Sequence, residues 1–379
     1  MKSIFVVGST GFLGREALEV IRLLGEEYKV IGITGFNNVN ILSEQIINFS
    51  PTYAGASNEL LPELKKIFGK IYIFDVEKEL EHVLGDAAPD LTLFLSSKVT
   101  ALRSIHNLIL NGRFVGIGNK ESIIAGGEIL FSEKTRKFVI PIDSEPSAIF
   151  QCLIGESHDE IKNLIITASG GPFVDRDKST FNSIKKEEAL KHPRWKMGKK
   201  ITIDSSTLIN KAFEVIEAHF LFEMPYEKIK VVIHRESVVH SIVEFEDGNM
   251  KAILSPPIMH FPLQFAITYP YRIKSGLPQL NLSNLKYLTF EEMDSEKFPG
   301  FNIVLEHGKR GGNFLPIIVA LDEVLVESFL DEKIKYTEIC SHLEKILERF
   351  SFEKINSIDE VEEFYNLGII TAKEFLRRN

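Results

Sequence analysis

The chain has 379 residues, 44% of them hydrophobic and 26% charged, so it is long enough for two or three domains with substantial cores. Its formal net charge of −9 argues against general nucleic-acid binding, which needs a basic face. Cys152 and Cys340 are its only cysteines, so no disulfide framework is expected and a reducing cytoplasm fits. The N-terminal residues lack the apolar core of a signal peptide, and no apolar run approaches the roughly 18 residues of a membrane helix. We therefore expect a globular cytoplasmic protein without a membrane segment.

Strands and helices alternate over the first part of the chain. An apolar strand at 1–7 leads through a glycine loop into a helix near 15–24, and a second strand covers 29–34. Further on, the pattern predicts an amphipathic run at 59–68, strands at 71–74, 91–96 and 114–118, and a helix at 100–111. Parallel strands need a crossover connection, usually a helix, so this alternation predicts a parallel sheet. We predict a doubly wound, Rossmann-like dinucleotide-binding domain over 1–144, which makes the fold class α/β.

The rest of the chain changes character twice. Strands predicted at 164–169, 230–235 and 240–247 mix with helices, which predicts a central α+β domain over 145–275. Asp247 and Gly248 lie between alternating apolar positions and favour a hairpin there. A proline-rich exit leads into a linker at 276–300. Beyond it, helical periodicity at 313–330, 336–350, 358–365 and 371–377 predicts a C-terminal helical bundle over 301–379.

The motif GSTGFLG at 8–14 follows the first strand directly and precedes a helix. Glycine lets the backbone turn sharply and approach a pyrophosphate closely, while the helix N-terminus points at the anion. The alternative is a structural turn without a cofactor.

A second anion-binding pattern occurs at 201–217. Residues 201–203 are predicted as a short strand, and Asp204 to Thr207 are all good N-cap residues for the helix that follows. A helix N-terminus is a natural seat for a phosphate. Asn210, Lys211, Glu214 and Glu217 are three or four residues apart and share one helix face. The segment therefore predicts a site for one small ligand that carries a phosphate and binds a cation.

Two carboxylates, Asp143 and Glu145, follow a predicted strand. In an extended chain, residues i and i+2 point the same way, so the two can converge. Converging carboxylates repel each other unless a cation or a proton joins them, and oxygen ligands suit Mg²⁺ or Mn²⁺. The alternative is a pair of solvated acids at a strand end.

Two further motifs have both a functional and a structural interpretation. In GNKES, Lys120 and Glu121 lie at the end of a predicted parallel strand, where ligands of open α/β sheets bind, although such a pair is more often on the surface. In HPRWKMG, His192 and Trp195 could be ordinary surface and core residues. Five basic residues at 191–200 favour an exposed loop; they are Lys191, Arg194, Lys196, Lys199 and Lys200.

Together these motifs resemble one enzyme family. GSTGFLG at 8–14, GNKES at 118–122, PIDSEPSAIFQ at 141–151, the segment 167–219 and VIHRESVVHSIVEFEDG at 232–248 are similar, in the same order, to the 1-deoxy-D-xylulose 5-phosphate reductoisomerase family. The resemblance implies the rearrangement of 1-deoxy-D-xylulose 5-phosphate and its reduction to 2-C-methyl-D-erythritol 4-phosphate, with NADPH and a divalent metal. Another NAD(P)-dependent oxidoreductase of a phosphorylated small molecule, or a non-catalytic cofactor sensor, are the alternatives.

The resemblance also implies roles for individual residues. One divalent metal ion (Mg, Mn or Co) would be held by Asp143, Glu145 and Glu214, which with Lys120 form the catalytic group. The implied substrate contacts are Lys120, Ser144, Glu145, Ser169, His192, Trp195, Ser205, Asn210, Lys211 and Glu214. The implied NADPH contacts are Thr10, Gly11, Phe12, Leu13, Gly35, Asn37, Asn38, Asn119, Glu121 and Gly198. The segment of about 185–200 corresponds to a lid, the family is usually homodimeric, and His240 has either a supporting or a purely structural role.

The chain departs from the family pattern in two places. Relatives typically carry a basic residue in the turn after the second strand, whereas this chain has Gly35, Phe36, Asn37 and Asn38 there. An acid at this turn would favour NAD and a basic residue would favour NADP. We therefore expect a reduced preference for NADPH over NADH. In the C-terminal part, the family's helix with an Asn-Glu pair reads ALDEVLVESFL at 320–330.

Overall fold

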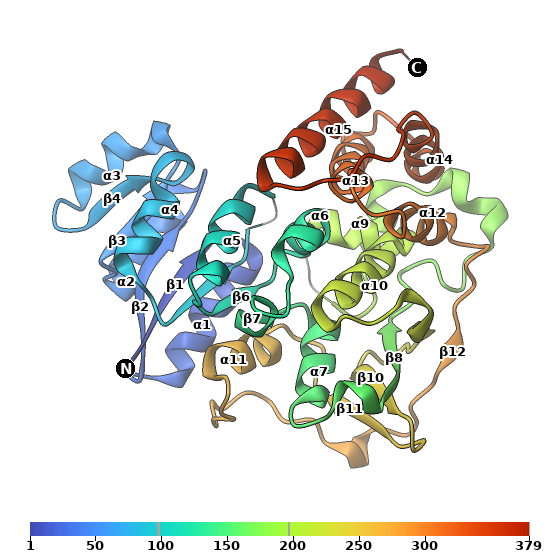
Figure 1. The fold of residues 1–379 in the computed structure, drawn as a ribbon, viewed down its shortest axis with the longest axis horizontal. Helices are drawn as coiled ribbons and strands as arrows, with labels where there is room; N and C mark the ends of the chain where they lie inside the picture. The colour runs from blue at the N-terminus through green and yellow to red at the C-terminus, as the bar shows by residue number, and fades with distance from the viewer. Residues whose placement is uncertain (97–98, 196–197, 379) are drawn as a thin grey trace. The chain divides into compact units, whose positions relative to one another are not determined.

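The computed structural model describes residues 1–96, 99–195 and 198–378, and the chain divides into two compact units (Figure 1). The first unit comprises Met1–Asn119, Ser132–Ser147 and Met259–Pro278. The second comprises Lys120–Phe131, Ala148–Ile258 and Gln279–Asn379. Each unit is built around its own sheet. Among the described helices, none is both long enough and apolar enough to cross a membrane.

The first unit has a seven-stranded sheet in the order β4-β3-β2-β1-β5-β6-β7, with every neighbouring pair parallel. Its strands are β1 (Lys2–Val7), β2 (Tyr28–Thr34), β3 (Tyr53–Ala56), β4 (Tyr72–Asp75), β5 (Leu91–Phe94), β6 (Val115–Ile117) and β7 (Val139–Pro141). The strand order reverses between β1 and β5, so ligands of such a sheet bind at the carboxyl ends of these two strands. The predicted doubly wound parallel sheet is confirmed. Strand β3 was not predicted from the sequence.

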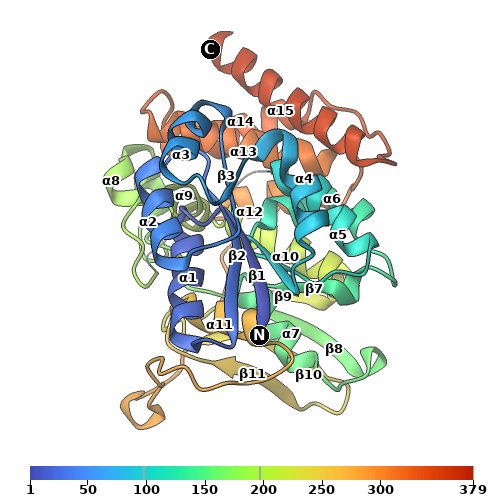
Figure 2. The same cartoon turned by 90° about the vertical axis from the view of Figure 1, so that its left-hand side faces the viewer.

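Helices cover both faces of this sheet, α1 and α2 on one side and α4 and α5 on the other (Figure 2). The helices of the unit are α1 (Phe12–Leu24), α2 (Val39–Phe49), α3 (Leu61–Ile67), α4 (Val76–Ala87), α5 (Leu102–Leu110) and α11 (His260–Thr268). Helix α11 comes from much later in the chain and packs against α1. There the His260 ring lies 2.6 Å from a carboxylate oxygen of Glu16. The C-terminal half of the chain therefore also contributes to the first unit.

The second unit has a five-stranded mixed sheet in the order β11-β10-β8-β9-β12. Its strands are β8 (Ile161–Ala168), β9 (Ile229–Ile233), β10 (Val239–Phe245), β11 (Met250–Leu254) and β12 (Glu291–Glu292). Strands β8 and β9 are parallel, and the other neighbours are antiparallel. The hairpin predicted at Asp247 and Gly248 is confirmed, since β10 and β11 pair across this turn.

The helices of the second unit pack around α13, which is buried on nearly all sides and contacts α6, α14 and α15. The helices are α6 (Lys120–Leu130), α8 (Lys186–Ala189), α9 (Lys199–Thr207), α10 (Ile209–Phe222), α12 (Pro299–Gly308), α13 (Phe314–Leu330), α14 (Tyr336–Leu347) and α15 (Ile358–Arg378). Helix α7 (Ser144–Leu153) begins in the first unit and ends in the second. Short 3₁₀ turns occur at Asn58–Leu60, Val99–Ala101, Arg136–Phe138, His158–Glu160, Lys178–Ser183, Tyr226–Lys228 and Leu282–Asn284. The predicted C-terminal helices are confirmed, except that 358–365 and 371–377 belong to one helix.

The strand predicted at 201–203 is wrong, because these residues lie inside helix α9. The β-branched side chains there favour a strand locally, but tertiary contacts override the propensity. Thr202 satisfies its hydroxyl within the helix by donating to the carbonyl of Gly198 at 2.8 Å, and Ile203 is fully buried. Helix α9 ends at Leu208, whose φ of 58° lies in the left-handed region, and α10 begins at the next residue.

Close approach of the backbone requires glycine at position 14. A Cβ atom at Gly14 would lie 2.2 Å from the carbonyl oxygen of Gly8, whereas one at Gly85 in α4 would meet nothing within 4 Å. We expect Gly14→Ala to lower the free energy of unfolding by about 1–3 kcal/mol or more, since backbone must move. Gly85→Ala is the matched control and should raise it by about 0.5–1 kcal/mol. Thermal unfolding of both variants checks this, and equal midpoints would contradict the tight contact.

Candidate active site

The glycine loop of the first unit is shaped for an anion. Gly8 follows β1 with φ of 86°, and its carbonyl accepts a hydrogen bond from the amide of Gly11 at 3.2 Å. Gly11 is the N-cap of α1, whose first turn contains no acidic residue. The positive end of the helix dipole therefore faces the C-terminal end of β1, where a pyrophosphate would bind. Thr10, Phe12 and Leu13 belong to this loop and the first turn of α1, as predicted.

The turn after β2 lies against the same loop. A Cβ atom at Gly35 would lie 2.4 Å from the methyl group of Thr10, so the backbone of Gly35 lies close against the Thr10 side chain. The Asn38 side chain caps α2 by accepting a hydrogen bond from the amide of Ile41 at 3.1 Å. The side-chain oxygen of Asn38 therefore already serves the helix. Phe36 is 47% exposed.

Asn119 terminates the loop that follows β6. Its side chain is almost fully buried and donates a hydrogen bond to the carbonyl of Ser96 at 2.5 Å. Ser96 follows β5, so this bond ties together the carboxyl ends of two neighbouring strands. Asn119 therefore lies at the edge of the sheet where dinucleotide folds bind their ligands.

The paired carboxylates Asp143 and Glu145 are not in an extended segment, which corrects the expected geometry. Asp143 follows β7, and Glu145 lies in the first turn of α7. Ser144 connects them, because its amide donates to Asp143 Oδ1 at 3.1 Å and its hydroxyl contacts Glu145 Oε2 at 2.5 Å. The turn into the helix, rather than strand alternation, sets the geometry of the two acids. Their donor atoms are all oxygens, which suits a hard divalent cation.

In the second unit, Glu214 on α10 is a buried carboxylate between two lysines. Its side chain is 1% exposed. Lys211 Nζ lies 2.5 Å from Glu214 Oε2 and also donates to the carbonyl of Thr167 in β8 at 2.7 Å. Lys120 Nζ, at the start of α6, lies 3.4 Å from Glu214 Oε1. Two ammonium groups thus compensate the negative charge that burial would otherwise make costly.

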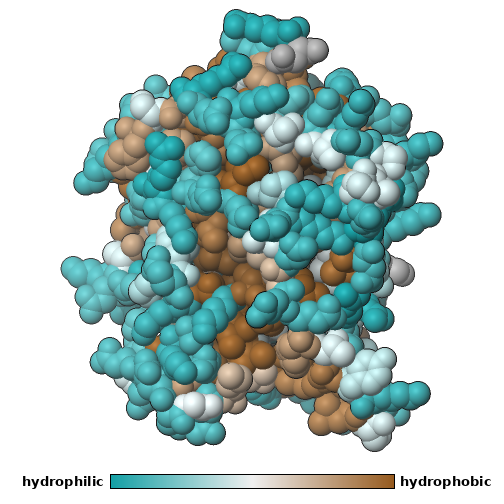
Figure 3. Space-filling view, turned by 90° about the vertical axis from the view of Figure 1, so that its right-hand side faces the viewer, coloured by the Kyte–Doolittle hydropathy of each residue, from teal (hydrophilic) through white to brown (hydrophobic). Residues whose placement is uncertain are grey.

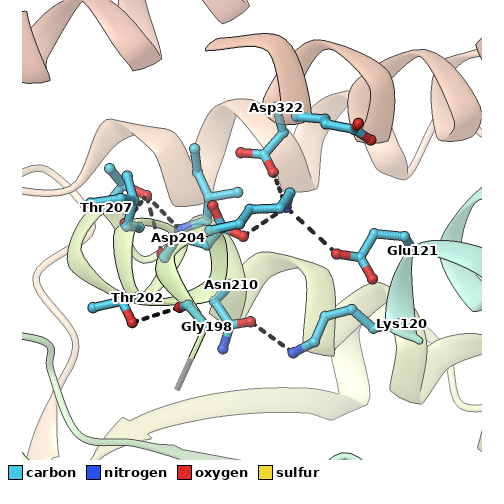
Figure 4. A network of polar contacts seen from close by, with 12 residues as sticks. Lys120, Glu121, Gly198, Thr202, Asp204, Thr207, Asn210 and Asp322 are labelled. Atoms are coloured by element: carbon cyan, nitrogen blue, oxygen red, sulfur yellow. Dashed lines mark hydrogen bonds and ion pairs between the residues drawn. The ribbon is translucent and has the colours of Figure 1, made fainter. Parts of the chain in front are cut away.

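Asn210 completes this cluster. It accepts a hydrogen bond from Lys120 Nζ at 2.7 Å (Figure 4). It also donates a hydrogen bond to Glu214 Oε1 at 2.5 Å. Lys211, Glu214 and Glu217, spaced three residues apart, are all buried on α10. The side chains brought together here can bind an anion through the lysines and a cation through the carboxylate.

Ser169 and His192 are in contact, although 23 residues separate them. The distance from His192 Nε2 to the Ser169 hydroxyl oxygen is 3.1 Å. His192 Nδ1 accepts hydrogen bonds from the amides of Arg194 and Trp195 at 3.2 and 2.8 Å. Since Nδ1 is an acceptor, the ring proton is on Nε2, which donates to Ser169. The ring therefore orders the loop and one predicted phosphate ligand at the same time.

The loop at 192–195 rests on the segment that joins β9 and β10. The Arg194 side chain donates to the carbonyl of Arg235 at 3.0 Å. The Trp195 ring lies 5.8 Å from the His240 ring at 60°. His240 is buried, and its Nε2 lies 3.1 Å from the carbonyl oxygen of Ser255. Residues 196 and 197 of the predicted lid lie outside the described residues, and Gly198 follows as the N-cap of α9.

Ser205 lies in the last turn of α9, not at the N-cap of a following helix, which corrects the predicted phosphate seat. A Cβ atom at Gly171 would lie 2.7 Å from the carbonyl oxygen of Ser205, so the loop after β8 packs on this turn. A buried ion cluster around Lys200 was not predicted. Its i, i+4 spacing to Asp204 could have indicated one pair, but Glu121 and Asp322 are too distant in sequence.

A doubly wound sheet with this glycine loop defines a dinucleotide-binding enzyme of the α/β class. Three family models cover most of the chain. They describe the 1-deoxy-D-xylulose 5-phosphate reductoisomerase (residues 4–127), its C-terminal domain (139–222) and the DXP reductoisomerase C-terminal domain (254–367).

Similar proteins extend over the full length. The chain is 41% identical to the 1-deoxy-D-xylulose 5-phosphate reductoisomerase of Caldanaerobacter subterraneus, covering 100% of this chain and 99% of the relative. It is 39% identical to the 1-deoxy-D-xylulose 5-phosphate reductoisomerase of Thermodesulfovibrio yellowstonii, covering 95% of this chain and 96% of the relative. A crystal structure of DOX-P reductoisomerase with NADPH, fosmidomycin and magnesium matches with a TM-score of 0.91 at 30% identity. The match covers 100% of this chain and 98% of the other. The structure of the Zymomonas mobilis enzyme with NADPH also matches with a TM-score of 0.91 at 30% identity, and the match covers 99% of each chain.

The chain belongs to the 1-deoxy-D-xylulose 5-phosphate reductoisomerase family. The activity of this family is the NADPH-dependent conversion of 1-deoxy-D-xylulose 5-phosphate into 2-C-methyl-D-erythritol 4-phosphate in the non-mevalonate pathway.

Proposed function

We propose that this chain catalyses the family's reaction with NADPH and one divalent metal ion, using the side chains described above. The observation that carries the proposal is the buried cluster of Lys120, Lys211 and Glu214, because a stable core has no need of three buried charges. A related crystal structure contains NADPH, fosmidomycin and magnesium. The test is oxidation of NADPH by the purified chain, followed by absorbance, with 1-deoxy-D-xylulose 5-phosphate and with or without Mg²⁺. No oxidation under any of these conditions would overturn the proposal.

Asp143, Glu145 and Glu214 are the proposed ligands of the metal, which is Mg, Mn or Co. The three form an all-oxygen donor set of the kind that holds such ions. When bound, the ion would supply Lewis-acid polarisation of substrate oxygens. Ser144 orients the two acids of the first unit, since it hydrogen bonds to both. Lys120 and Lys211 hold Glu214 in place.

The proposed phosphate ligands are Ser169, Ser205, Asn210 and Lys211. Lys211 lies in the first turn of α10, where the helix dipole also favours an anion. Lys120 would contact the reacting part of the substrate. Binding of the remote phosphate supplies energy that closes the lid over the substrate and excludes water. His192 and Trp195 are the proposed substrate contacts of that lid, at about 185–200.

NADPH is the proposed hydride donor, and the first unit carries most of its contacts. The pyrophosphate would bind the amides at the start of α1, where no acid opposes it. The proposed contacts are Thr10, Gly11, Phe12 and Leu13 in this loop, Gly35, Asn37 and Asn38 at the adenosine end, and Asn119, Glu121 and Gly198 at the nicotinamide end. In this proposal residues 1–144 mainly bind the cofactor, and 145–275 bind substrate and metal together with Lys120 and Asp143. Residues 276–300 form a linker, and 301–379 form the C-terminal domain.

A cytoplasmic homodimer is the proposed assembly. Strand β11 forms one edge of the second sheet, and its Met250 and Leu254 side chains are exposed. An edge strand offers backbone groups to another strand, so a second copy could extend the sheet. One face of the molecule carries apolar side chains gathered near its centre among polar ones (Figure 3). Both cysteines are free thiols, which fits a reducing compartment.

Replacing Glu214 by Gln should remove the metal dependence. The substitution keeps the shape and removes the charge, so turnover should fall by orders of magnitude, as Lewis-acid stabilisation contributes several kcal/mol. Binding of Mn²⁺, followed by the EPR signal of the free ion, should weaken in parallel. Glu244→Gln is the control, because this acid is held by Lys162 on the second sheet. Near-normal turnover of Glu214→Gln at saturating Mg²⁺ would refute the three-carboxylate site.

Fluorescence of Trp195 should report closure of the lid. Trp195 is the only tryptophan of the chain, and its ring is half-buried against His240. A lid must open to admit its ligand and then close, so fosmidomycin should change the emission spectrum. Calorimetry on the same sample establishes binding independently. An unchanged spectrum at saturation would argue that the loop is rigid or remote from the ligand.

NADPH should be preferred over NADH by a smaller margin than in relatives with a basic residue after β2. Residues 34–38 contain no charge, and Asn38 already caps α2. Each missing charged hydrogen bond to the 2′-phosphate would have contributed about 1.5–3 kcal/mol. Comparison of kcat/KM for the two reduced cofactors measures the preference. Equal values, or a preference for NADH, would overturn the assignment of NADPH.

A further inference from the structure

A single lysine lies among three carboxylates in the second unit. Lys200 Nζ is 2.5 Å from Asp322 Oδ2, 2.8 Å from Asp204 Oδ2 and 3.6 Å from Glu121 Oε1. Asp322 is fully buried and Asp204 is 4% exposed. In Figure 4 the dashed lines from these acids converge on one ammonium group. None of the family's implied metal or phosphate ligands belongs to this cluster.

The three acids come from three different helices, two of which carry groups of the proposed site. Asp204 is in α9, directly before Ser205. Glu121 is in α6, directly after Lys120. Asp322 is in α13, the most buried helix of the unit. Lys200 is the second residue of α9 and lies at the C-terminal end of the segment proposed as the lid.

The cluster contains one lysine and three acidic side chains, so its formal charges do not balance. Burial, and then the nearby Asp322, raise the pKa of Asp204 to about 8, and burial also raises the pKa of Asp322. The surrounding acids outweigh burial at Lys200 and hold its pKa well above its usual value. The cluster therefore contains a charged lysine and retains a proton on its aspartates near neutral pH. The ammonium also lies 5.6 Å from the centre of the Phe213 ring, on α10.

We propose that Lys200 is a positioning residue, whose ion cluster holds α9 between α6 and α13 and so places Ser205 and Lys120 for the substrate. The same contacts fix the C-terminal end of the lid segment, because Lys200 lies only two residues after Gly198. This inference rests on the proposed function for the identity of the substrate. Apolar residues of similar size could hold three helices together as well or better, whereas directed ion contacts select one arrangement of them.

The test is a charge-balanced variant. Lys200→Met alone leaves the buried Asp204 and Asp322 and the partly buried Glu121 without this cation and can fail to fold. Lys200→Gln with Asp322→Asn removes one charge of each sign, so folding is retained while the directed contacts are lost. We expect its KM for 1-deoxy-D-xylulose 5-phosphate to rise roughly tenfold to a hundredfold, because small displacements of binding groups have effects of this size. Affinity for fosmidomycin should fall similarly, while Mn²⁺ affinity stays unchanged.

A matched control removes an exposed pair from the same unit. Lys162 and Glu244 form an ion pair of 2.8 Å at the surface of the second sheet, and replacing both by Gln should leave KM unchanged. Lys200→Arg keeps the charge and should restore part of the affinity. A folded Lys200→Gln/Asp322→Asn variant with wild-type KM would overturn the inference. If the wild-type chain shows no turnover, the proposed function fails, and amide hydrogen exchange of α9 decides the positioning role: faster exchange in the variant supports it, and equal exchange overturns it.

A pH profile distinguishes this cluster from a merely structural pair. Between pH values of about 4 and about 8, Asp204 is protonated in the folded chain and ionised in the unfolded chain, so unfolding releases a proton and stability falls as pH rises. Asp204→Asn should reduce this slope of the unfolding midpoint and the matching change in KM near pH 8. If the variant kept the full pH slope of its unfolding midpoint and the full change in KM near pH 8, the positioning role of the cluster would be contradicted. The titratable groups of the cluster are Lys200, Asp204, Glu121 and Asp322, and those that interact with it from outside are Glu323 and Tyr365.

Discussion

The burial of Glu214 is the constraint on which the second unit depends. An isolated carboxylate inside a protein costs several kcal/mol, so it must be surrounded by cations or hydrogen-bond donors. Lys211 meets this need and also donates to Thr167, which ties α10 to the central strand β8. Lys120 brings the start of α6 to the same carboxylate. One buried acid therefore organises the two helices and the strand that carry the proposed substrate ligands.

The break at Leu208 has a comparable effect on a smaller scale. A left-handed residue other than glycine costs roughly 1–2 kcal/mol, and Leu208 accepts this strain while its side chain is buried. The break ends α9 after Ser205 and starts α10 just before Asn210. A single continuous helix would place these side chains along one axis. Two helices instead present the last turn of one and the first turn of the other, and the first turn of α10 has no acid that would repel a phosphate.

In the first unit, the available space rather than the burial of charge restricts which residues can form the cofactor loop. The glycine loop brings the start of α1 so near to the end of β1 that no side chain fits at Gly14. Amides at this helix start are thereby available to a pyrophosphate. In the proposed function the first unit supplies the cofactor loop with Asp143 and Glu145, and the second supplies the phosphate ligands with Glu214.

Local sequence determined much of this protein. Alternation of strands and helices predicted the parallel sheet, an Asp-Gly turn predicted the β10–β11 hairpin, and contiguous motifs were sufficient to indicate the family. These features depend on neighbouring residues, so periodicity and turn chemistry report them directly. Short segments whose conformation depends on distant contacts were predicted wrongly. Residues 201–203 form a helix in which Thr202 and Ile203 are buried, and Glu145 lies in a helix rather than in an extended strand.

Only the tertiary structure decided which side chains meet. The contact of His192 with Ser169, the two lysines on Glu214 and the convergence of Glu121, Asp204 and Asp322 on Lys200 join residues up to about two hundred positions apart. No local pattern encodes such pairings, because they arise when helices from separate parts of the chain pack together. The sequence by itself therefore determined the family and the types of groups available for chemistry. The packing of α6, α9, α10 and α13 decided how those groups are charged, paired and positioned, since burial makes each unpaired charge too costly to keep.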